Sequence, residues 1–364
     1  MKHPSLTRLF VAGAAAMAAT LGAMAALPHR TAVRWQSTQT EAYARLGWVY
    51  QRIHQDPTPI DIAFIGTSHT MNGINGAAVH AALAERGRCL TVANLAIPQY
   101  GRNLHWAITR ELLGARRPRL IVLEVDENES RKAHPLFYRV ARSADLAEAP
   151  ALFNQNYLDD LIRLPWRQSV LAAQSLAPGE FGLKPAWNPA DYDGSDVDNT
   201  RVINVNGQAL TPPRTRALPA QRLIAEGRAE MANKQLHMLP RSMAGQEYAV
   251  PNTYVRAILS LADATKTPVL LLYLPGYGRP AAPMDMALYT GHQMLSVNDL
   301  LADTTRWYDV DHLNAAGAAA VSQRVGAALA AMLPANAAPG APCGNGYAPR
   351  AALKPFQPPR RPQA

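Results

Sequence analysis

Four short runs of apolar residues stand at wide intervals along the chain and contain few polar positions. They are Ile60 to Ile65, Leu90 to Ala96, Arg119 to Val125 and Thr267 to Leu274. Runs of this length that do not alternate between polar and apolar residues predict strands covered on both faces.

Apolar residues at helical spacing fill several segments around these runs. Helices are predicted over residues 38–55, 77–86, 103–113, 252–264, 284–301 and 318–333. Strands that alternate with helices of about a dozen residues are typical of a parallel sheet with helices on both faces. The pattern therefore predicts an α/β protein with three α/β/α layers and a parallel sheet of about five strands.

The alternation weakens between residues 130 and 250. Residues 151–164 have a helical pattern, whereas residues 185–213 are rich in Asp, Asn, Gly and Pro and predict a long excursion. Structureless runs of this length in a compact domain are usually lids or binding loops. We expect residues 130–250 to form a large insertion over the face of the domain that carries Ser68, a serine discussed below.

The amino terminus has the plan of an export signal. Lys2 and Arg8 supply positive charge, and an uncharged run of 19 residues follows from Leu9 to Leu27. Residues 23–25, Ala-Met-Ala, place small side chains where a signal peptidase cleaves. The run is also long enough to be an uncleaved membrane anchor, but its nine alanines give little drive for insertion.

A signal peptide over residues 1–25 is therefore favoured over an anchor. Cleavage would give a periplasmic or secreted protein, and an anchor would hold the body on the inner membrane facing the periplasm. Either way, we expect an exported protein.

The net charge of +9 is concentrated at the two ends of the chain. Residues 1–34 and residues 335–364 each carry four Lys or Arg and no acid, so the body between them carries only +1. A broad surface for nucleic acid is therefore not expected. Proline, glycine and basic residues dominate the segment 335–364, which predicts a disordered tail after a domain at 38–334.

The chain contains two cysteines, Cys89 and Cys343. An exported location permits a disulfide between them. Such a bond would attach the tail to the fold, but the sequence is equally consistent with two unpaired thiols. Neither cysteine has the spacing of a metal ligand.

Ser68 follows the first apolar run, in the segment Gly66-Thr-Ser-His69. Gly66 permits a sharp bend, and open α/β sheets bind ligands at the carboxyl ends of their strands. A serine on a strand-to-helix turn exposes its Oγ beside backbone N–H groups, as a nucleophile requires. Taken alone, Ser68 is equally consistent with a turn or helix-capping residue.

The segment Asp309-Val-Asp-His312 supplies the partners that a nucleophilic serine needs. Histidine can take the hydroxyl proton near neutral pH, and a carboxylate can orient its ring. Because Asp309 and His312 are three positions apart, one turn of loop can bring the carboxylate to Nδ1 and leave Nε2 for Ser68. Asp311 adjoins the histidine and is expected to point elsewhere.

These residues together resemble the SGNH/GDSL hydrolase superfamily. Besides Gly66-Thr-Ser-His69 and Asp309-x-x-His312, the resemblance includes Asn94 to Gly101 after the second strand and Asp126 to Glu129 after the third. It covers about residues 60–130 and 265–333. It implies a flavodoxin-like fold of the SGNH-hydrolase type.

The resemblance also implies roles for individual residues. Ser68, His312 and Asp309 would form a catalytic triad, and the oxyanion hole would consist of the backbone N–H groups of Ser68 and Gly101 with the side chain of Asn128. This sequence departs from the usual blocks, with Thr67 in place of aspartate, Asp126 in place of glycine and Glu129 in place of aspartate.

The acids Asp126, Glu127 and Glu129 are expected to form a solvated loop rather than a metal site. No metal or other cofactor is expected. His69, beside the serine, is expected either to line a pocket or to pack against the turn.

The expected function is that of an exported serine esterase, or deacetylase, acting on acyl groups ester-linked to a carbohydrate. An alternative is a polysaccharide O-acetyltransferase with the same triad, because hydrolysis and transfer share one acyl-enzyme. A third is a non-catalytic carbohydrate-binding or scaffold protein. The expected partners are an acylated carbohydrate and proteins of exopolysaccharide assembly, with membrane contact only through an uncleaved amino-terminal segment.

Overall fold

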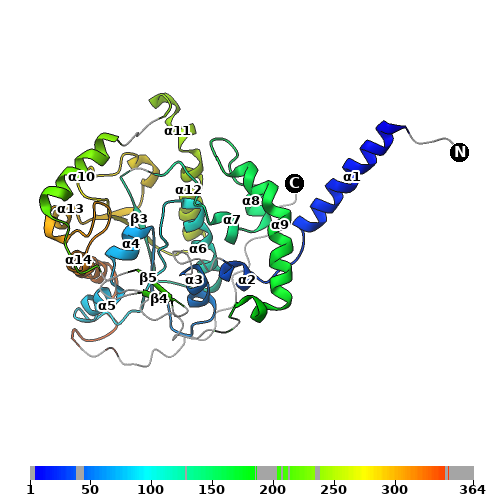
Figure 1. The fold of residues 1–364 in the computed structure, drawn as a ribbon. Helices are drawn as coiled ribbons and strands as arrows, with labels where there is room; N and C mark the ends of the chain where they lie inside the picture. The colour runs from blue at the N-terminus through cyan, green and yellow to red at the C-terminus, as the bar shows by residue number, and fades with distance from the viewer. Residues whose placement is uncertain are drawn as a thin grey trace.

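The computed structural model describes residues 5–37, 45–127, 129–184, 186, 203–205, 208–211, 214–233, 238–340 and 343. Its centre is a sheet with helices on both faces, and one apolar helix projects from the body (Figure 1).

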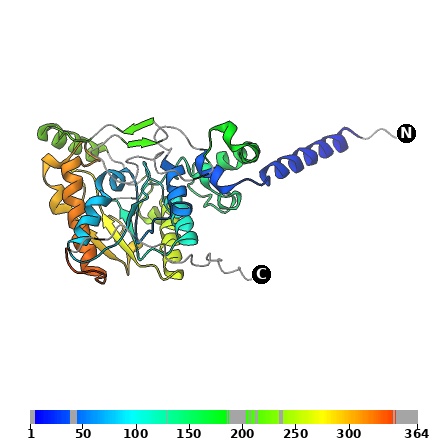
Figure 2. The same cartoon turned by 90° about the horizontal axis from the view of Figure 1, so that it is seen from below.

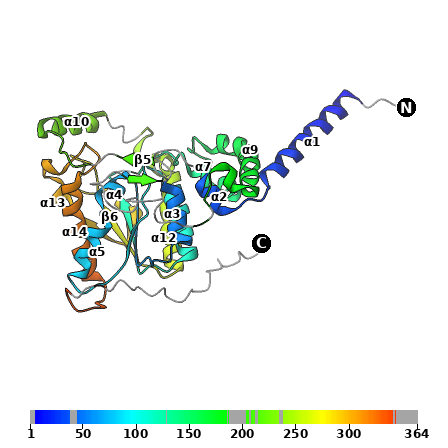
Figure 3. The same cartoon turned by 60° about the horizontal axis from the view of Figure 1, so that its bottom comes forward.

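The central sheet has five strands, all parallel. They are β1 (Ile62–Ile65), β2 (Val92–Asn94), β3 (Leu120–Val125), β6 (Val269–Tyr273) and β7 (Gln293–Ser296), in the spatial order β2-β1-β3-β6-β7. Numbered within this sheet alone, the order is 2-1-3-4-5, which is the flavodoxin-like arrangement. The predicted α/β class, with three layers and about five parallel strands, is confirmed (Figure 3).

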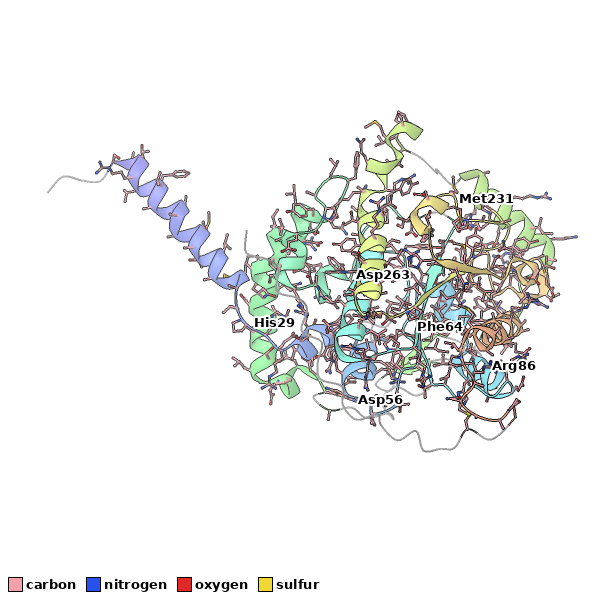
Figure 4. All side chains as sticks on the ribbon, turned by 180° about the vertical axis from the view of Figure 1, so that it is seen from behind. His29, Asp56, Phe64, Arg86, Met231 and Asp263 are labelled. Carbon is pink, nitrogen blue, oxygen red and sulfur yellow. A yellow bond between two sulfur atoms is a disulfide. The ribbon has the colours of Figure 1, made fainter. Side chains whose placement is uncertain are left out.

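A hydrophobic core lies on each face of the sheet. Successive side chains of a strand point to opposite faces, so alternate residues of each strand pack into different cores. Ile65, Leu123 and Leu271 pack with α3 (Arg45–His54), α6 (Arg102–Ala115) and α12 (Ala249–Ala264). Phe64, Val122 and Leu272 pack with α5 (Gly76–Ala84) and α14 (Ala315–Met332). Phe64 lies among the densely packed side chains of the body (Figure 4). Burial on both faces explains why these strands have continuous apolar sequences.

The prediction of one helix over residues 284–301 is wrong. This segment forms a short 3₁₀ helix η4 (Met286–Tyr289), the strand β7 and a short helix α13 (Asn298–Leu301). β7 lies at the edge of the sheet, with its two end residues exposed and its two central residues only partly buried. An edge strand of this kind lacks the apolar run that revealed the other four strands.

The segment between β3 and α12 contains most of the remaining elements. They are α7 (Phe137–Val140), α8 (Ser143–Ala147), α9 (Tyr157–Leu176), η1 (Pro178–Phe181), β4 (Ile203–Val205), β5 (Gln208–Thr211), α10 (Ala220–Asn233), η3 (Arg241–Met243) and α11 (Ala244–Glu247). The helix predicted over residues 151–164 therefore starts later and runs further, as α9. β4 and β5 pair as an antiparallel hairpin outside the central sheet (Figure 2).

The amino-terminal apolar run forms α1 (Leu6–Ala25), which is the only helix in the described part of the chain that is long and apolar enough to cross a membrane. None of its residues is buried, and most of its length projects away from the body (Figure 4), whereas Ala25 at its end packs against the core. This helix is compatible with a signal peptide or an anchor. The short helix α2 (Thr31–Gln36) follows it and packs Val33 and Trp35 into the body.

Cys89 and Cys343 form a disulfide across 254 positions of sequence. The first residues of the expected tail also contact the loop after α5. The N–H of Cys89 donates to Oδ1 of Asn336 at 2.7 Å, and Nδ2 of Asn336 donates to the carbonyl of Cys89 at 2.9 Å. The rest of the expected tail, residues 341–342 and 344–364, lies outside the described residues.

Removing this disulfide should lower stability, because the bond closes a very long loop and so restricts the unfolded chain. We expect Cys343→Ser to lower the free energy of unfolding by about 2–4 kcal/mol, measured by urea denaturation. Reductant should destabilise the wild type to the same extent and leave the variant unchanged. Equal stability of the reduced and oxidised wild type would contradict this assignment.

Candidate active site

Ser68 lies at a sharp turn between the end of β1 and the helix α4 (Ser68–Gly73). The turn requires glycine at position 66, because a Cβ there would lie 2.3 Å from Oε2 of Glu124. Thr67 caps α4, and its side-chain oxygen accepts the N–H of His69 at 3.1 Å. These two residues fix the place where the serine leaves the sheet.

His312 lies on the loop between the short helix η5 (Thr304–Arg306) and α14. The loop is closed by an antiparallel bridge between Trp307 and Leu313, and the N–H of Tyr308 donates to the carbonyl of His312 at 2.9 Å. Within it, Oδ1 of Asp309 accepts the N–H of Asp311 at 3.0 Å and that of His312 at 2.8 Å. An aspartate that bonds backbone N–H groups two and three residues on stabilises such a turn.

Ser68, His312 and Asp309 form a continuous chain of hydrogen bonds. Nε2 of His312 lies 2.8 Å from Oγ of Ser68, although the two residues are 244 positions apart. Nδ1 of His312 lies 2.9 Å from Oδ1 and 3.0 Å from Oδ2 of Asp309. With Nδ1 donating to the carboxylate, Nε2 is left to accept the serine proton.

The Asp309 carboxylate is held in its ionised form. Burial alone would raise its pKa, because burial disfavours the charged form. Hydrogen bonds from the His312 ring and from the N–H groups of Asp311 and His312 outweigh burial, so the pKa of Asp309 is lowered below its ordinary value. The carboxylate therefore carries its charge at neutral pH and can stabilise a protonated His312.

Asp311 points away from this chain of hydrogen bonds. Its Oδ1 lies 3.3 Å from Nη2 of Arg279. The structure thus places Asp309, rather than its neighbour, beside the imidazole.

The N–H of Ser68 donates to no acceptor in the described part of the chain, although its neighbours in the turn are all engaged. The N–H groups of Thr67 and Thr70 donate to Glu124, at 2.8 and 2.9 Å, and that of His69 donates to Thr67. The turn therefore leaves one backbone donor beside Oγ. Such a donor is suited to an oxygen that gains negative charge during a reaction.

The other two predicted oxyanion donors have different outcomes. Gly101 is buried next to the first residue of α6, and Tyr100 before it lines the cavity around Ser68. Its φ is 148°, and a Cβ would lie 2.3 Å from Cβ of His134, so both backbone and packing require glycine. Asn128 lies outside the described residues.

Glu124 is a site residue that the sequence pattern concealed. Only 1% exposed, it lies on the central strand β3 directly beneath the serine turn. Its carboxylate accepts the two N–H groups named above and the Thr67 hydroxyl, the last at 2.6 Å. One carboxylate therefore holds both ends of the turn that presents Ser68.

Ser68 and His312 line a cavity of about 730 Å³. The insertion contributes Ser130, Lys132, Gln155 and Asn156 to its wall, together with Arg214. Residues from the segment 130–250 thus line the same cavity as Ser68, whereas most of the predicted excursion at 185–213 lies outside the described residues. A cavity of this size holds far more than an acetyl group.

The wall of this cavity is rich in cations. Arg45, Lys132 and Arg214 line it, whereas none of the described lining residues is an Asp or Glu. Arg214 also forms an ion pair with Asp309, with 3.8 Å between Nη1 and Oδ2. The sequence does not point to Arg214, because the preceding residues 185–213 have no periodic pattern from which its neighbours could be predicted.

His69 packs against the turn instead of lining the cavity. Its Nδ1 lies 3.1 Å from the carbonyl of Leu274, and its Nε2 lies 3.1 Å from the hydroxyl of Tyr100. Its ring meets the ring of His312 edge-on, with centroids 5.8 Å apart. Burial and nearby acids raise the pKa of Tyr100, so its hydroxyl stays neutral and can donate to His69.

The expectation of a solvated acidic loop after β3 is wrong. Asp126 and Glu127 are 5% and 2% exposed, and Oε1 of Glu127 lies 3.4 Å from Nε of Arg279. Glu129 makes a two-pronged ion pair with Arg102, at 2.6 and 2.7 Å. The basic partners of Glu127 and Glu129 come from other parts of the chain, so local composition alone does not reveal that these acids are covered.

No protein-family model matches this chain, and a search of curated proteins gives no match. The chemistry of the site is therefore inferred from its own residues.

Replacing the carboxylate beneath the serine turn should destabilise the fold. Glu124→Gln keeps the shape but places an NH₂ group where N–H and O–H donors point. We expect a loss of about 1.5–3 kcal/mol in the free energy of unfolding, as for hydrogen bonds to a charged group. Urea denaturation measures this loss. The matched control Thr67→Ser keeps its hydroxyl and should lose less, whereas wild-type stability in Glu124→Gln would refute the role.

Proposed function

We propose that this protein is an exported serine acyl hydrolase that cleaves ester-linked acyl groups. The observation that carries the proposal is the hydrogen-bonded chain from Ser68 through His312 to Asp309, with 2.8 Å between Oγ and Nε2. A serine, an imidazole and a carboxylate in this order are the parts of a nucleophilic triad, whatever their positions in sequence.

In the proposed reaction, Nε2 of His312 takes the hydroxyl proton as Oγ of Ser68 attacks the ester carbonyl. Asp309 keeps the proton on Nδ1 and stabilises the imidazolium that forms. His312 then gives its proton to the leaving alkoxide, and the alcohol departs. The acyl group remains bonded to Oγ of Ser68. Water, deprotonated by His312, then attacks the acyl carbonyl. The bond between the acyl group and Oγ breaks, His312 returns the proton to Oγ, and the acyl group leaves as a carboxylic acid.

The oxyanion of each tetrahedral intermediate would be bound by the free N–H of Ser68. Removal of one such donor in other enzymes costs about 3–4 kcal/mol of transition-state stabilisation. By the resemblance to the SGNH/GDSL hydrolases, the N–H of Gly101 and the side chain of Asn128 would complete the hole.

An acyl group on a carbohydrate is the proposed substrate. The cavity beside Ser68 is far larger than an acetyl group and carries the amide side chains of Gln155 and Asn156, which can hydrogen-bond sugar hydroxyls. The lining cations Lys132 and Arg214 favour a substrate that carries negative charge. Proteins that assemble exopolysaccharide are proposed partners, by the same resemblance.

A polysaccharide O-acetyltransferase is the second candidate. The size of the cavity, about 730 Å³, favours it, because an acceptor alcohol could occupy the space beside an acyl-enzyme. Exclusion of water by the inserted segment would then decide between transfer and hydrolysis. A non-catalytic carbohydrate-binding or scaffold protein is the third candidate.

Turnover of a chromogenic acetyl ester should depend on the triad. We expect Ser68→Ala to abolish the burst of product and to reduce kcat by at least about 10³-fold. Asp309→Asn should reduce kcat by about 10⁴-fold, because the amide favours the wrong tautomer of His312. Asp311→Asn is the matched control and should retain most activity. Ser68-independent turnover, or none with any acyl donor, would favour the binding protein.

An added acceptor should separate hydrolysis from transfer. We expect a hydrolase to release free acetate from a labelled acetyl donor at a rate that oligosaccharide acceptors do not change. The label is followed by mass spectrometry of the acceptor and by the free acetate released. Movement of most of the label onto the acceptor would instead assign the protein as a transferase.

A further inference from the structure

Exposed apolar side chains on the body gather in one region. Beyond residue 27, and among the residues whose exposure is described, every exposed Leu, Ile, Val, Phe or Trp falls between residues 152 and 181. The other large exposed apolar side chains of the body are Tyr100 and five scattered methionines. Single exposed apolar residues are ordinary on a soluble protein, but a concentrated patch marks an interaction surface.

The patch follows one face of α9. Leu158, Ile162 and Trp166 are 70%, 78% and 70% exposed and stand four residues apart, so they form one stripe along the helix. The opposite side of α9 is anchored in the body through Leu164 and Leu171. One face of α9 is therefore packed on the body, and the large apolar residues on its other face can bind a second apolar surface.

The apolar helix α1 leaves the body beside α9. Both helices lie at the same end of the molecule in three views (Figures 1, 2 and 3). Hydrogen bonds fix the residues at and after the end of α1. The hydroxyl of Ser143 donates to the carbonyl of Ala25, and Nε2 of Gln168 on α9 donates to that of Leu27, both at 3.4 Å.

The connection from α1 to the body is also short. Only residues 26–30 separate α1 from α2, and the N–H of Arg30 donates to Oγ of Ser175 on α9 at 2.9 Å. Five residues extend about 17 Å at most. A membrane that contained α1, whose 20 residues span about 30 Å, would therefore lie close to α9.

We propose that the stripe of Leu158, Ile162 and Trp166 rests on the lipid bilayer that α1 spans. α1 is then a retained anchor, and α9 is a second contact that lies in the membrane surface. Tryptophan is favoured at this depth because its ring is apolar and its N–H is polar. The charges beside the stripe largely cancel, since Arg163 pairs with Asp159 at 2.9 Å, so the contact is mainly apolar.

This contact would hold the candidate active site near the membrane. Gln155 and Asn156, which line the cavity of Ser68, come directly before α9. Substrates close to the membrane surface would then have preferred access. Only this consequence depends on the proposed function, because the membrane contact itself involves no residue of the triad.

A fluorescent label on α9 tests the contact in the full-length chain. Cys89 and Cys343 are paired, so Ile162→Cys supplies one reactive thiol for an environment-sensitive fluorophore. The protein is reconstituted in phosphatidylcholine–phosphatidylglycerol vesicles, and its amino terminus is identified by mass spectrometry. We expect spin-labelled lipid to quench this label at least twofold more strongly than a label at Met332→Cys, the matched exposed position on α14.

Adding Leu158→Glu and Trp166→Glu should abolish the lipid quenching at position 162 while α1 still keeps the protein on the vesicles. Three results would overturn the proposal. The first is equal access of aqueous iodide to the labels at positions 162 and 332. The second is a label at 162 shielded from both iodide and lipid, as a protein partner would cause. The third is a protein whose amino terminus shows that residues 1–25 have been cleaved off and which does not bind the vesicles. Loss of esterase activity would leave the proposal unaffected.

Discussion

The contact between Ser68 and His312 depends on the parallel arrangement of the central sheet. The serine turn follows β1. The loop after β6 is hydrogen-bonded to the loop of His312, because the N–H of Tyr277 donates to the carbonyl of Val310 at 2.7 Å. Both strands end at the same edge because they run in the same direction. Residues 244 positions apart thereby meet at 2.8 Å. The flavodoxin-like order makes this edge a natural place for a site, since ligands of open α/β sheets bind at the carboxyl ends of the strands.

A second layer of buried polar groups supports this contact. Glu124 holds the serine turn from below, and the pair of His69 and Tyr100 lies behind the His312 ring. Glu124 and His69 are buried and hydrogen-bonded, so they hold the serine turn in one position. Reacting groups must be held in position to within a fraction of an ångström, and hydrogen-bonded groups behind them restrict their movement.

The sequence predicted the fold to the extent that burial was continuous. β1, β2, β3 and β6 have apolar runs because both faces are covered. The edge strand β7 has only two partly buried residues, so its sequence does not distinguish it from a helix. Ser68, Asp309 and His312 were found because their chemistry restricts which residues can act. Glu124 was hidden inside the apolar run of β3, and the partners of Glu127 and Glu129 come from distant segments that no local pattern reveals.

The central claim is that Ser68 is an activated nucleophile, and its covalent modification is the most direct measurement. The full-length protein is treated with a fluorophosphonate, and tandem mass spectrometry locates the adduct. The structure predicts a single adduct on Oγ of Ser68, formed much more slowly in His312→Ala because no base then takes the hydroxyl proton. Failure to modify Ser68 in the folded protein, or an equal rate without His312, would contradict the account.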